Sequence, residues 1–235
     1  IVDDGSTDNT AAVVAPYVQA DKRVQYVQQK QNEGLQKTLN HGLRVATGEM
    51  VARIDADDVW CMKDKLALQV VYLQTHDDCV LVGTGVIVVD ARGIEQYRYL
   101  NPVHDSEIRT QCLAKNCFAH PCVLFRKKVA GQDVWYSEES MHRHIEDYEL
   151  WLRLGRYGLL ANLPIYALRY CISETQITSR NGINQIRKTI TLIRQYRGVY
   201  PLFWRSLLWH YIRLVVYRYV RFDLLHYWKS YWCRV

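Results

Sequence analysis

Apolar and polar positions over the first 55 residues follow two periods, one typical of strands and one typical of helices. Leu35, Leu39 and Leu43 recur at helical spacing, for example, and so lie on one face of a predicted helix. The whole pattern predicts strands at residues 1–4, 23–28 and 50–55 and helices at residues 9–20 and 34–46. Because proline lacks a backbone N–H, Pro16 predicts a kink or an early stop in the first helix.

This alternation predicts an α/β fold with a mostly parallel, Rossmann-like sheet, flanked by helices and connected by right-handed crossovers. Continuous apolar runs at residues 80–93 and 122–127 are typical of buried strands and extend the sheet. Ligands of such folds bind beyond the carboxyl ends of the strands. The first and third predicted strands both end in acids, which we expect to border one crevice: Asp3, Asp4, Asp55, Asp57 and Asp58.

The acids of "RIDADD" repel one another unless something holds them together. Converging carboxylates either raise one another's pKa or bind a cation, and an all-oxygen site suits Mg²⁺ or Mn²⁺. Acids at the exit of a strand are also common as solvated turn formers or helix caps. The residues alone leave both interpretations open.

Composition places the chain among globular proteins, because 49% of its 235 residues are hydrophobic and can bury a sizeable core. Its seven cysteines include no CxxC pair, and their odd number excludes a fully paired set of disulfides, which favours a reducing cytosol. Cys112, Cys117 and Cys122 do not match a common zinc spacing, so we interpret them as buried thiols. The net charge of +6 comes without a nucleic-acid recognition motif, so we expect no nucleic-acid partner.

The C-terminal part of the sequence is helical in pattern after about residue 182, and residues 201–235 mix Trp, Tyr, Leu and Arg. An uncharged run of ~18 residues, which a membrane-spanning helix needs, does not occur there. Aromatic residues interleaved with arginines are typical of a helix that lies on an anionic membrane surface. A helical hairpin that packs on the rest of the chain or on another subunit explains the same pattern equally well.

Four ordered blocks resemble the family 2 glycosyltransferases with the GT-A fold: "IVDDGSTDNT", "NEGLQKTLNHGLRVATGEMVARIDADD", "FAHPCVLFRK" and "EDYELWLRL". The resemblance implies transfer of a sugar from a nucleotide diphosphate sugar to an acceptor hydroxyl, usually with inversion, in cell-surface polysaccharide or glycolipid synthesis. It makes residues 1–182 the catalytic domain and residues 183–235 a helical extension. Residue 1 lies inside an apolar run, so we expect an N-terminal truncation that removes the family's first strand.

The resemblance also implies roles for the acids on the donor side. Asp57 and Asp58 would bind the metal, with Asp57 also near the ribose, and Asp55 is the first acid of the motif. Asp4 falls on the acid that contacts the nucleobase, and Asp3 is its neighbour in the same site. The donor would be bound on the cytoplasmic side, with peripheral contact to the membrane through residues 201–235.

The "ED" block places Glu146 and Asp147 at the start of a predicted helix. Acids are favoured in a first helical turn by the helix dipole, without any catalytic role. The resemblance instead makes Asp147 the general base that accepts the proton of the attacking hydroxyl, and Glu146 the residue that orients it or the acceptor.

The sequence also departs from the family pattern, because Ser173 stands where histidine is frequent and "AGQDVWYSEESMHRH" replaces a shorter turn before the "ED" block. Among nearby histidines, His120 is expected to be merely hydrogen-bonded. His142 and His144 are expected to lie on the surface of a polar loop, and the alternative is that they approach phosphate or the acceptor. Lys37 and Arg53 are candidates to neutralise phosphate, and each is explained equally well as a solvated helix or strand residue. The alternative functions are a non-catalytic remnant that binds a membrane or a partner, and a sugar-phosphate nucleotidylyltransferase.

Overall fold

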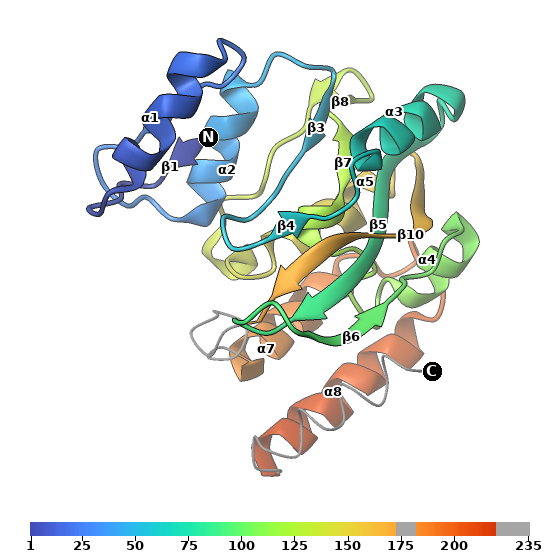
Figure 1. Cartoon of the computed structure of the whole chain (residues 1–235). Helices are drawn as coiled ribbons and strands as arrows, with labels where there is room; N and C mark the ends of the chain where they lie inside the picture. Colours follow the sequence, from blue (N-terminus) through green and yellow to red (C-terminus); the bar gives the residue numbers. More distant parts are fainter. Residues whose placement is uncertain (173–181, 220–235) are drawn as a thin grey trace.

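The computed structural model describes residues 1–172 and 182–219 of the chain, and it has an α/β fold in which helices cover a central sheet (Figure 1). Its helices are α1 (Thr10–Ala20), α2 (Leu35–Val45), α3 (Lys65–Thr75), α4 (Asp105–Gln111), α5 (Glu146–Leu154), α7 (Gly182–Arg194) and α8 (Phe203–Tyr219). Its strands are β1 (Val2–Asp3), β2 (Val27–Gln28), β3 (Met50–Ala52), β4 (Val59–Trp60), β5 (Cys79–Val89), β6 (Glu95–Tyr99), β7 (Leu124–Arg126), β8 (Lys128–Val129), β9 (Gln132–Asp133) and β10 (Leu159–Cys171). The predicted α/β class is confirmed.

The main sheet has the strand order β3-β7-β5-β10-β4, and β6 also pairs with β5. β5 and β10 are its longest strands and run parallel, from the Leu159–Cys79 pair to the Cys171–Val89 pair. The other pairings within this sheet are antiparallel. The sheet is therefore mixed where the alternating pattern predicted mostly parallel strands. One reason is that β5 and β6 are joined by a turn at Asp90 to Ile94, which is too short for a parallel crossover.

At the N-terminal end, β1 pairs with β2 in parallel, as predicted, and the two form a sheet of their own. The predicted strand at residues 23–28 is shorter than expected and pairs only through Val27 and Gln28. Of the two outcomes predicted for Pro16, a kink or an early stop, the early stop does not occur, because α1 continues to Ala20. α1 buries none of its residues, so the hydrogen bond that Pro16 cannot donate to Ala12 leaves a carbonyl near water rather than in the core.

Helix α2 packs against both the small sheet and the main sheet. A Cβ atom on Gly42 would lie 3.4 Å from the Val2 side chain of β1. On its other side, Leu39 and Leu43 pack in the main core together with Val51 of β3. One helix thus supports the first and third strands, whose ends carry the acids predicted to share a crevice.

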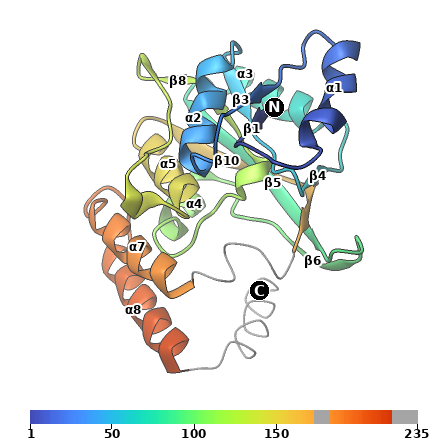
Figure 2. The same ribbon diagram turned by 90° about the vertical axis from the view of Figure 1, so that its left-hand side faces the viewer.

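The largest hydrophobic core includes the buried face of α5 and contains residues from α2 through to the first part of α8. Leu43 of α2, Phe125 of β7 and Trp151 of α5 belong to it, and so do Ile193 of α7 and Phe203 at the start of α8. Figure 2 shows α7 and α8 side by side, close to α5. The division into residues 1–182 and 183–235 stays a prediction, and this core contains side chains from both parts.

Within residues 1–172 and 182–219, the structure has no helix that combines the length and the apolar character needed to cross a bilayer. Helix α8 nonetheless exposes a row of large apolar side chains on one side. These are Trp204, Leu208, Tyr211, Ile212 and Val215. Residues 220–235, which complete the predicted membrane-contacting segment, lie outside the described residues.

Candidate active site

Three carboxylates meet in the loop that follows β3. Asp55, Asp57 and Asp58 each offer an oxygen atom, and these atoms all lie within 4.8 Å of one another. The loop is tightened by a hydrogen bond of 3.2 Å from the Asp58 N–H to the Asp55 carbonyl. Arg53 donates through two guanidinium nitrogens to the two carboxylate oxygens of Asp55. The three acids of this loop therefore lie together, and a crevice that they share with Asp3 and Asp4 stays a prediction.

Asp58 is the most buried acid of this group, with 7% of its surface exposed. Its Oδ1 atom accepts a hydrogen bond of 3.1 Å from the backbone N–H of Cys171, at the end of β10. Its Oδ2 atom is buried without a hydrogen-bond partner among the described residues. Burial raises the pKa of Asp58 to about 7, and the charges of Asp55 and Asp57 add to this shift.

These observations fit a divalent cation. An unpartnered buried carboxylate oxygen is costly, and a cation supplies the positive charge it lacks. The donor atoms are all oxygens, which suits Mg²⁺ or Mn²⁺ better than zinc. The cysteines behave differently: Cys112, Cys117 and Cys122 are buried free thiols, as predicted, and burial raises the pKa of each.

The acids at the end of β1 hold the surrounding loops. Asp3 is buried and accepts hydrogen bonds from the Ser6 N–H at 2.7 Å and from the Tyr26 hydroxyl, and these lower the pKa of Asp3. Asp4 accepts hydrogen bonds from the N–H groups of Glu33 and Gly34, at 2.7 and 3.0 Å, at the start of α2.

Gly5 makes this turn possible, because it has a φ of +76° and a Cβ atom there would lie 2.7 Å from the Gln31 backbone. The "DDGSTD" segment is therefore locked onto the loop that begins α2. Each carboxylate oxygen can accept more than one hydrogen bond, so these contacts leave acceptor capacity at Asp3 and Asp4.

The second acid pair begins α5, as the sequence predicted. Glu146 accepts a hydrogen bond of 2.5 Å from the N–H of His144, and burial raises the pKa of Glu146 to about 7. Asp147 accepts a hydrogen bond of 2.8 Å from the Asn116 side chain. Burial also raises the pKa of Asp147, and the hydrogen bonds to its carboxylate partly oppose this.

Arg53 connects the two acid groups electrostatically. Burial raises the pKa of Asp55 and of Asp147, and the positive charge of Arg53 opposes the shift in both. It does the same for Glu146. The Arg53 side chain is largely buried, with 11% of its surface exposed, so solvent screens its charge weakly. The "RIDADD" and "ED" acids therefore lie within the field of one buried cation.

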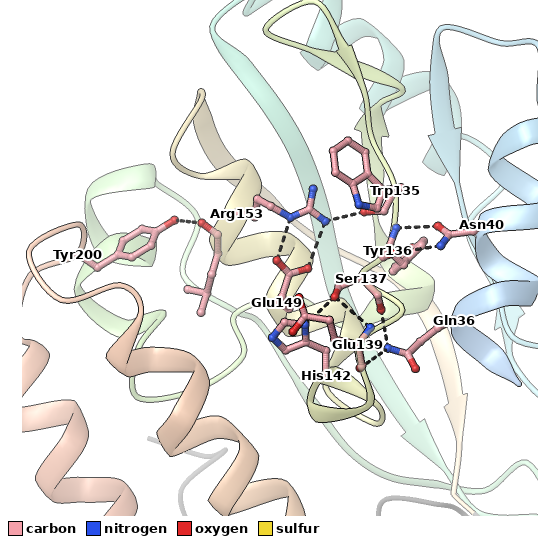
Figure 3. A network of polar contacts seen from close by, with 11 residues as sticks. Gln36, Asn40, Trp135, Tyr136, Ser137, Glu139, His142, Glu149, Arg153 and Tyr200 are labelled. Atoms are coloured by element: carbon pink, nitrogen blue, oxygen red, sulfur yellow. Dashed lines mark hydrogen bonds and ion pairs between the residues drawn. The ribbon is translucent and has the colours of Figure 1, made fainter.

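The loop before α5 is fastened to α2 (Figure 3). Asn40 donates to the carbonyl of Tyr136 at 2.9 Å and accepts from the N–H of the same residue at 2.8 Å. Gln36 donates to the carbonyl of Ser137 at 2.5 Å. On the other side of the loop, Arg153 of α5 donates to the Trp135 carbonyl. The segment that replaces the family's shorter turn is thus held rigidly between two helices.

The histidines of this region partly differ from expectation. His120 is hydrogen-bonded to the Tyr136 hydroxyl at 2.7 Å, as predicted, and burial lowers its pKa well below the ordinary value. The prediction that His142 lies on the surface is wrong, because it is 5% exposed and contacts the Ser137 hydroxyl at 2.7 Å. His144 is partly buried and adopts the left-handed φ of 72° that turns the chain into α5. Ser173 lies outside the described residues.

Sequence reasoning missed one side chain at the site and one contact of another. Asn116, which contacts Asp147, follows a short helix in a segment without a recognisable motif. The sequence left Arg53 open as a phosphate ligand or a solvated strand residue, whereas it forms an ion pair with Asp55. Its position two residues before Asp55 puts both side chains on one face of an extended chain, which was the available signal.

Residues 1–132 match the family described as Glycosyl transferase family 2. The amylovoran biosynthesis glycosyltransferase AmsE of Erwinia amylovora is 36% identical over 166 residues, which cover 70% of this chain and 60% of that protein. The O-antigen biosynthesis glycosyltransferase WbnJ of Escherichia coli is 30% identical over 156 residues, or 66% of this chain and 58% of that protein. The chain thus spans about 60% of the length of these relatives.

Two solved structures share the fold at lower sequence identity. S. aureus TarS 1-349 in complex with UDP-GlcNAc has a TM-score of 0.59 and 21% identity, covering 82% of this chain and 56% of that one. The mannosyltransferase PcManGT from Pyrobaculum calidifontis, in complex with GDP-Man and Mn²⁺, has a TM-score of 0.62 and 15% identity. It covers 97% of this chain and 68% of that chain. At these identities the likeness establishes the arrangement of helices and strands.

Proposed function

The chain belongs to glycosyl transferase family 2, and from this premise we propose that it transfers a sugar from a nucleotide diphosphate sugar to an acceptor hydroxyl. The transfer depends on a divalent metal and inverts the anomeric carbon, and it serves the synthesis of a cell-surface polysaccharide or glycolipid. The names of the relatives support this setting, since they act in amylovoran and O-antigen biosynthesis.

One observation carries the metal dependence: the buried Oδ2 atom of Asp58 has no hydrogen-bond partner among residues 1–172 and 182–219, and it belongs to a group of three converging carboxylates. Asp57 and Asp58 would hold Mg²⁺ or Mn²⁺, and Asp57 is the exposed member that faces solvent. A cation bound there would supply positive charge to the diphosphate as it leaves. The Mn²⁺ and GDP-Man in the structure of PcManGT are consistent with this proposal.

Asp147 is proposed as the general base. As the acceptor oxygen forms its bond to the anomeric carbon, the bond from that carbon to the diphosphate breaks on the opposite face. The hydroxyl proton moves to the Asp147 carboxylate, whose pKa is raised by burial and therefore lies closer to neutral pH. Asn116 fixes the orientation of this carboxylate through its hydrogen bond. Glu146 braces the turn at His144 and so orients the start of α5.

The nucleoside is proposed to bind beside the "DDGSTD" turn. Asp4 would accept a hydrogen bond from the nucleobase in addition to those from Glu33 and Gly34. Asp3 is already engaged by Ser6 and Tyr26, so its contribution is to shape the turn. Asp55 forms an ion pair with Arg53, so we assign it an indirect role next to the proposed metal ligands Asp57 and Asp58.

We also propose a peripheral contact with the cytoplasmic face of a membrane, and the exposed apolar side of α8 supports contact with a membrane surface. Trp204 is 65% exposed, and Leu208 and Ile212 follow it at helical spacing on the same side. Aromatic and aliphatic side chains on one helical face, near arginines, are typical of helices at a bilayer surface. Such a contact would bring a lipid-linked acceptor close to the enzyme.

Calorimetric titration with UDP and with GDP, each with Mn²⁺ and with EDTA, tests the proposal. We expect Mn²⁺-dependent binding of at least one nucleotide. Asp57→Ala should abolish it, whereas Asp133→Ala, which removes an exposed acid of β9, should leave it unchanged. Asp147→Asn should bind as wild type but fail to transfer sugar. Binding that is equally strong in EDTA would contradict the metal site, and normal transfer by Asp147→Asn would remove Asp147 as the base.

A further inference from the structure

A cavity of about 300 Å³ lies between the start of α5 and the C-terminal helices α7 and α8. Asp147 and Asn116 form part of one wall. His210, Arg213 and Tyr217 of α8 form another, and Lys115 completes the rim. The proposed base therefore faces a half-open space bordered by the C-terminal helices, and this space has the volume of a small ligand pocket.

Arg213 is the most distinctive group in this cavity. Its Nη1 atom lies 3.4 Å from Nδ1 of His210, whose Nε2 atom is 2.9 Å from the Leu113 carbonyl. Arginine can only donate, so His210 accepts at Nδ1 and donates at Nε2 as a neutral ring. Burial lowers the pKa of His210 to about 4, in agreement with this neutral form. The histidine thus positions the guanidinium without neutralising it.

The charges lining the cavity do not balance. Arg213 and Lys115 are positive, and Asp147 is the only carboxylate among the described lining residues. None of the ion pairs in the described parts of the chain includes Arg213. Arginine carries five N–H donors in a planar fork, and the histidine accepts only one of them. A partly buried cation whose other N–H donors have no acceptor among the described residues is suited to an anion with several oxygens.

We propose that this cavity is an acceptor subsite for a phosphate-bearing acceptor, whose phosphate contacts Arg213 and Lys115 while its hydroxyl lies at Asp147. The inference rests on the proposed function, because it assigns the acceptor class for the same base. It uses two elements that are far apart in sequence, the loop after α4 and helix α8. A phosphate on a lipid and a phosphate on a soluble saccharide share this chemistry.

The test is calorimetric titration of the full chain with inorganic pyrophosphate in EDTA, where the three carboxylates after β3 repel the anion. We expect wild type to bind, and Arg213→Gln and Lys115→Gln each to bind at least tenfold more weakly. Arg205→Gln is the matched control, since Arg205 is exposed on α8 and does not line the cavity. Lys115 is exposed and its replacement should not disturb folding. No binding by wild type, or unchanged binding by both cavity variants, would overturn the subsite.

Further titrations distinguish the source of the phosphate and separate this proposal from the proposed function. If geranyl diphosphate binds tenfold more tightly than pyrophosphate, the acceptor phosphate is on a lipid; if the two bind equally, it is on a soluble saccharide. Either result supports the subsite. Glucuronate binding in place of pyrophosphate would refute the phosphate assignment. The same variants are titrated with UDP or GDP and Mn²⁺: Arg213→Gln should retain this binding. If wild type does not bind UDP or GDP in the presence of Mn²⁺, the proposed function is contradicted. The pyrophosphate titration would still decide the subsite.

Discussion

Replacement of Asp147 by asparagine should make the protein more stable while it stops transfer. Burial raises the pKa of Asp147, which means that the ionised carboxylate is less favourable in the folded chain than in water. Asparagine has nearly the same shape, and its amide oxygen can accept the existing 2.8 Å hydrogen bond from Asn116. The substitution therefore removes a buried charge without leaving Asn116 unpaired.

The expected gain at pH 7 is about 1 kcal/mol, within the roughly 0.5–2 kcal/mol typical of relieving a destabilised active-site position. Part of the desolvation cost is already offset by the positive charge of Arg53, which keeps the gain modest. For a chain of this size, about 1 kcal/mol corresponds to a rise in Tm of roughly 2–4 °C. The measurement is thermal and urea unfolding of wild type and Asp147→Asn in EDTA.

The pH dependence gives this prediction its sign. Because folding raises the pKa of Asp147, the folded wild type binds this proton more tightly than the unfolded chain does. The resulting contribution to the free energy of unfolding is complete below the unfolded pKa of about 3.9, and it is lost as the pH rises through the folded pKa. The advantage of Asp147→Asn should thus be near zero well below pH ~3.9, grow as the pH rises towards the folded pKa, and reach its full size at neutral pH. Asp133→Asn, at an exposed position, should show no such trend. A wild type that is equally or more stable at pH 7 would refute the argument.

Three further outcomes follow from buried or exposed groups elsewhere. Lowering the pH from 6.5 to 4 should reduce the free energy of unfolding of wild type by about 1–3 kcal/mol more than that of His210→Gln, because folding lowers the pKa of His210 to about 4. An equal loss in both proteins, measured by urea unfolding, would contradict this. Gln69→Leu should cost at least about 2 kcal/mol in urea unfolding, because its buried amide donates at 2.9 Å to the carbonyls of Val82 and Cys122; a near-neutral change would contradict it. Trp204→Ser should reduce sedimentation with phosphatidylserine vesicles several-fold, whereas Val13→Ser, which is 64% exposed on α1, should not; equal loss would exclude α8 as the contact.

The sequence predicted those parts of the fold whose signal is local. The helical spacing of Leu35, Leu39 and Leu43 placed α2, and the continuous apolar run at residues 80–93 placed β5. The converging acids of residues 55–58 were also predicted, because they lie in one short loop. Local patterns of this kind can be read from the sequence because neighbouring residues share one backbone conformation.

Strand partners and distant contacts could not be predicted in the same way. β10 carries Pro164 and polar residues such as Asn162, so its pattern does not distinguish it from a loop, yet it pairs with β5 along its length. Its pairing is stabilised by tertiary contacts, including the Asn162 side chain donating to the Pro102 carbonyl at 2.8 Å. The contact between Asn116 and Asp147 spans 31 residues and likewise has no sequence signal.

The position of α5 connects these features to the proposed chemistry. Its buried face packs in the same core as Ile193 and Tyr196 of the C-terminal part, and the Tyr200 hydroxyl donates to the Leu152 carbonyl at 2.7 Å. Its first turn carries Asp147 into the cavity that Arg213 lines. The helices after residue 182 therefore do two things at once: they complete the core that holds the proposed base and they form the wall opposite to it. Under the two proposals, a change in these helices would alter acceptor binding without altering the proposed metal ligands, because the two groups of residues lie on different elements.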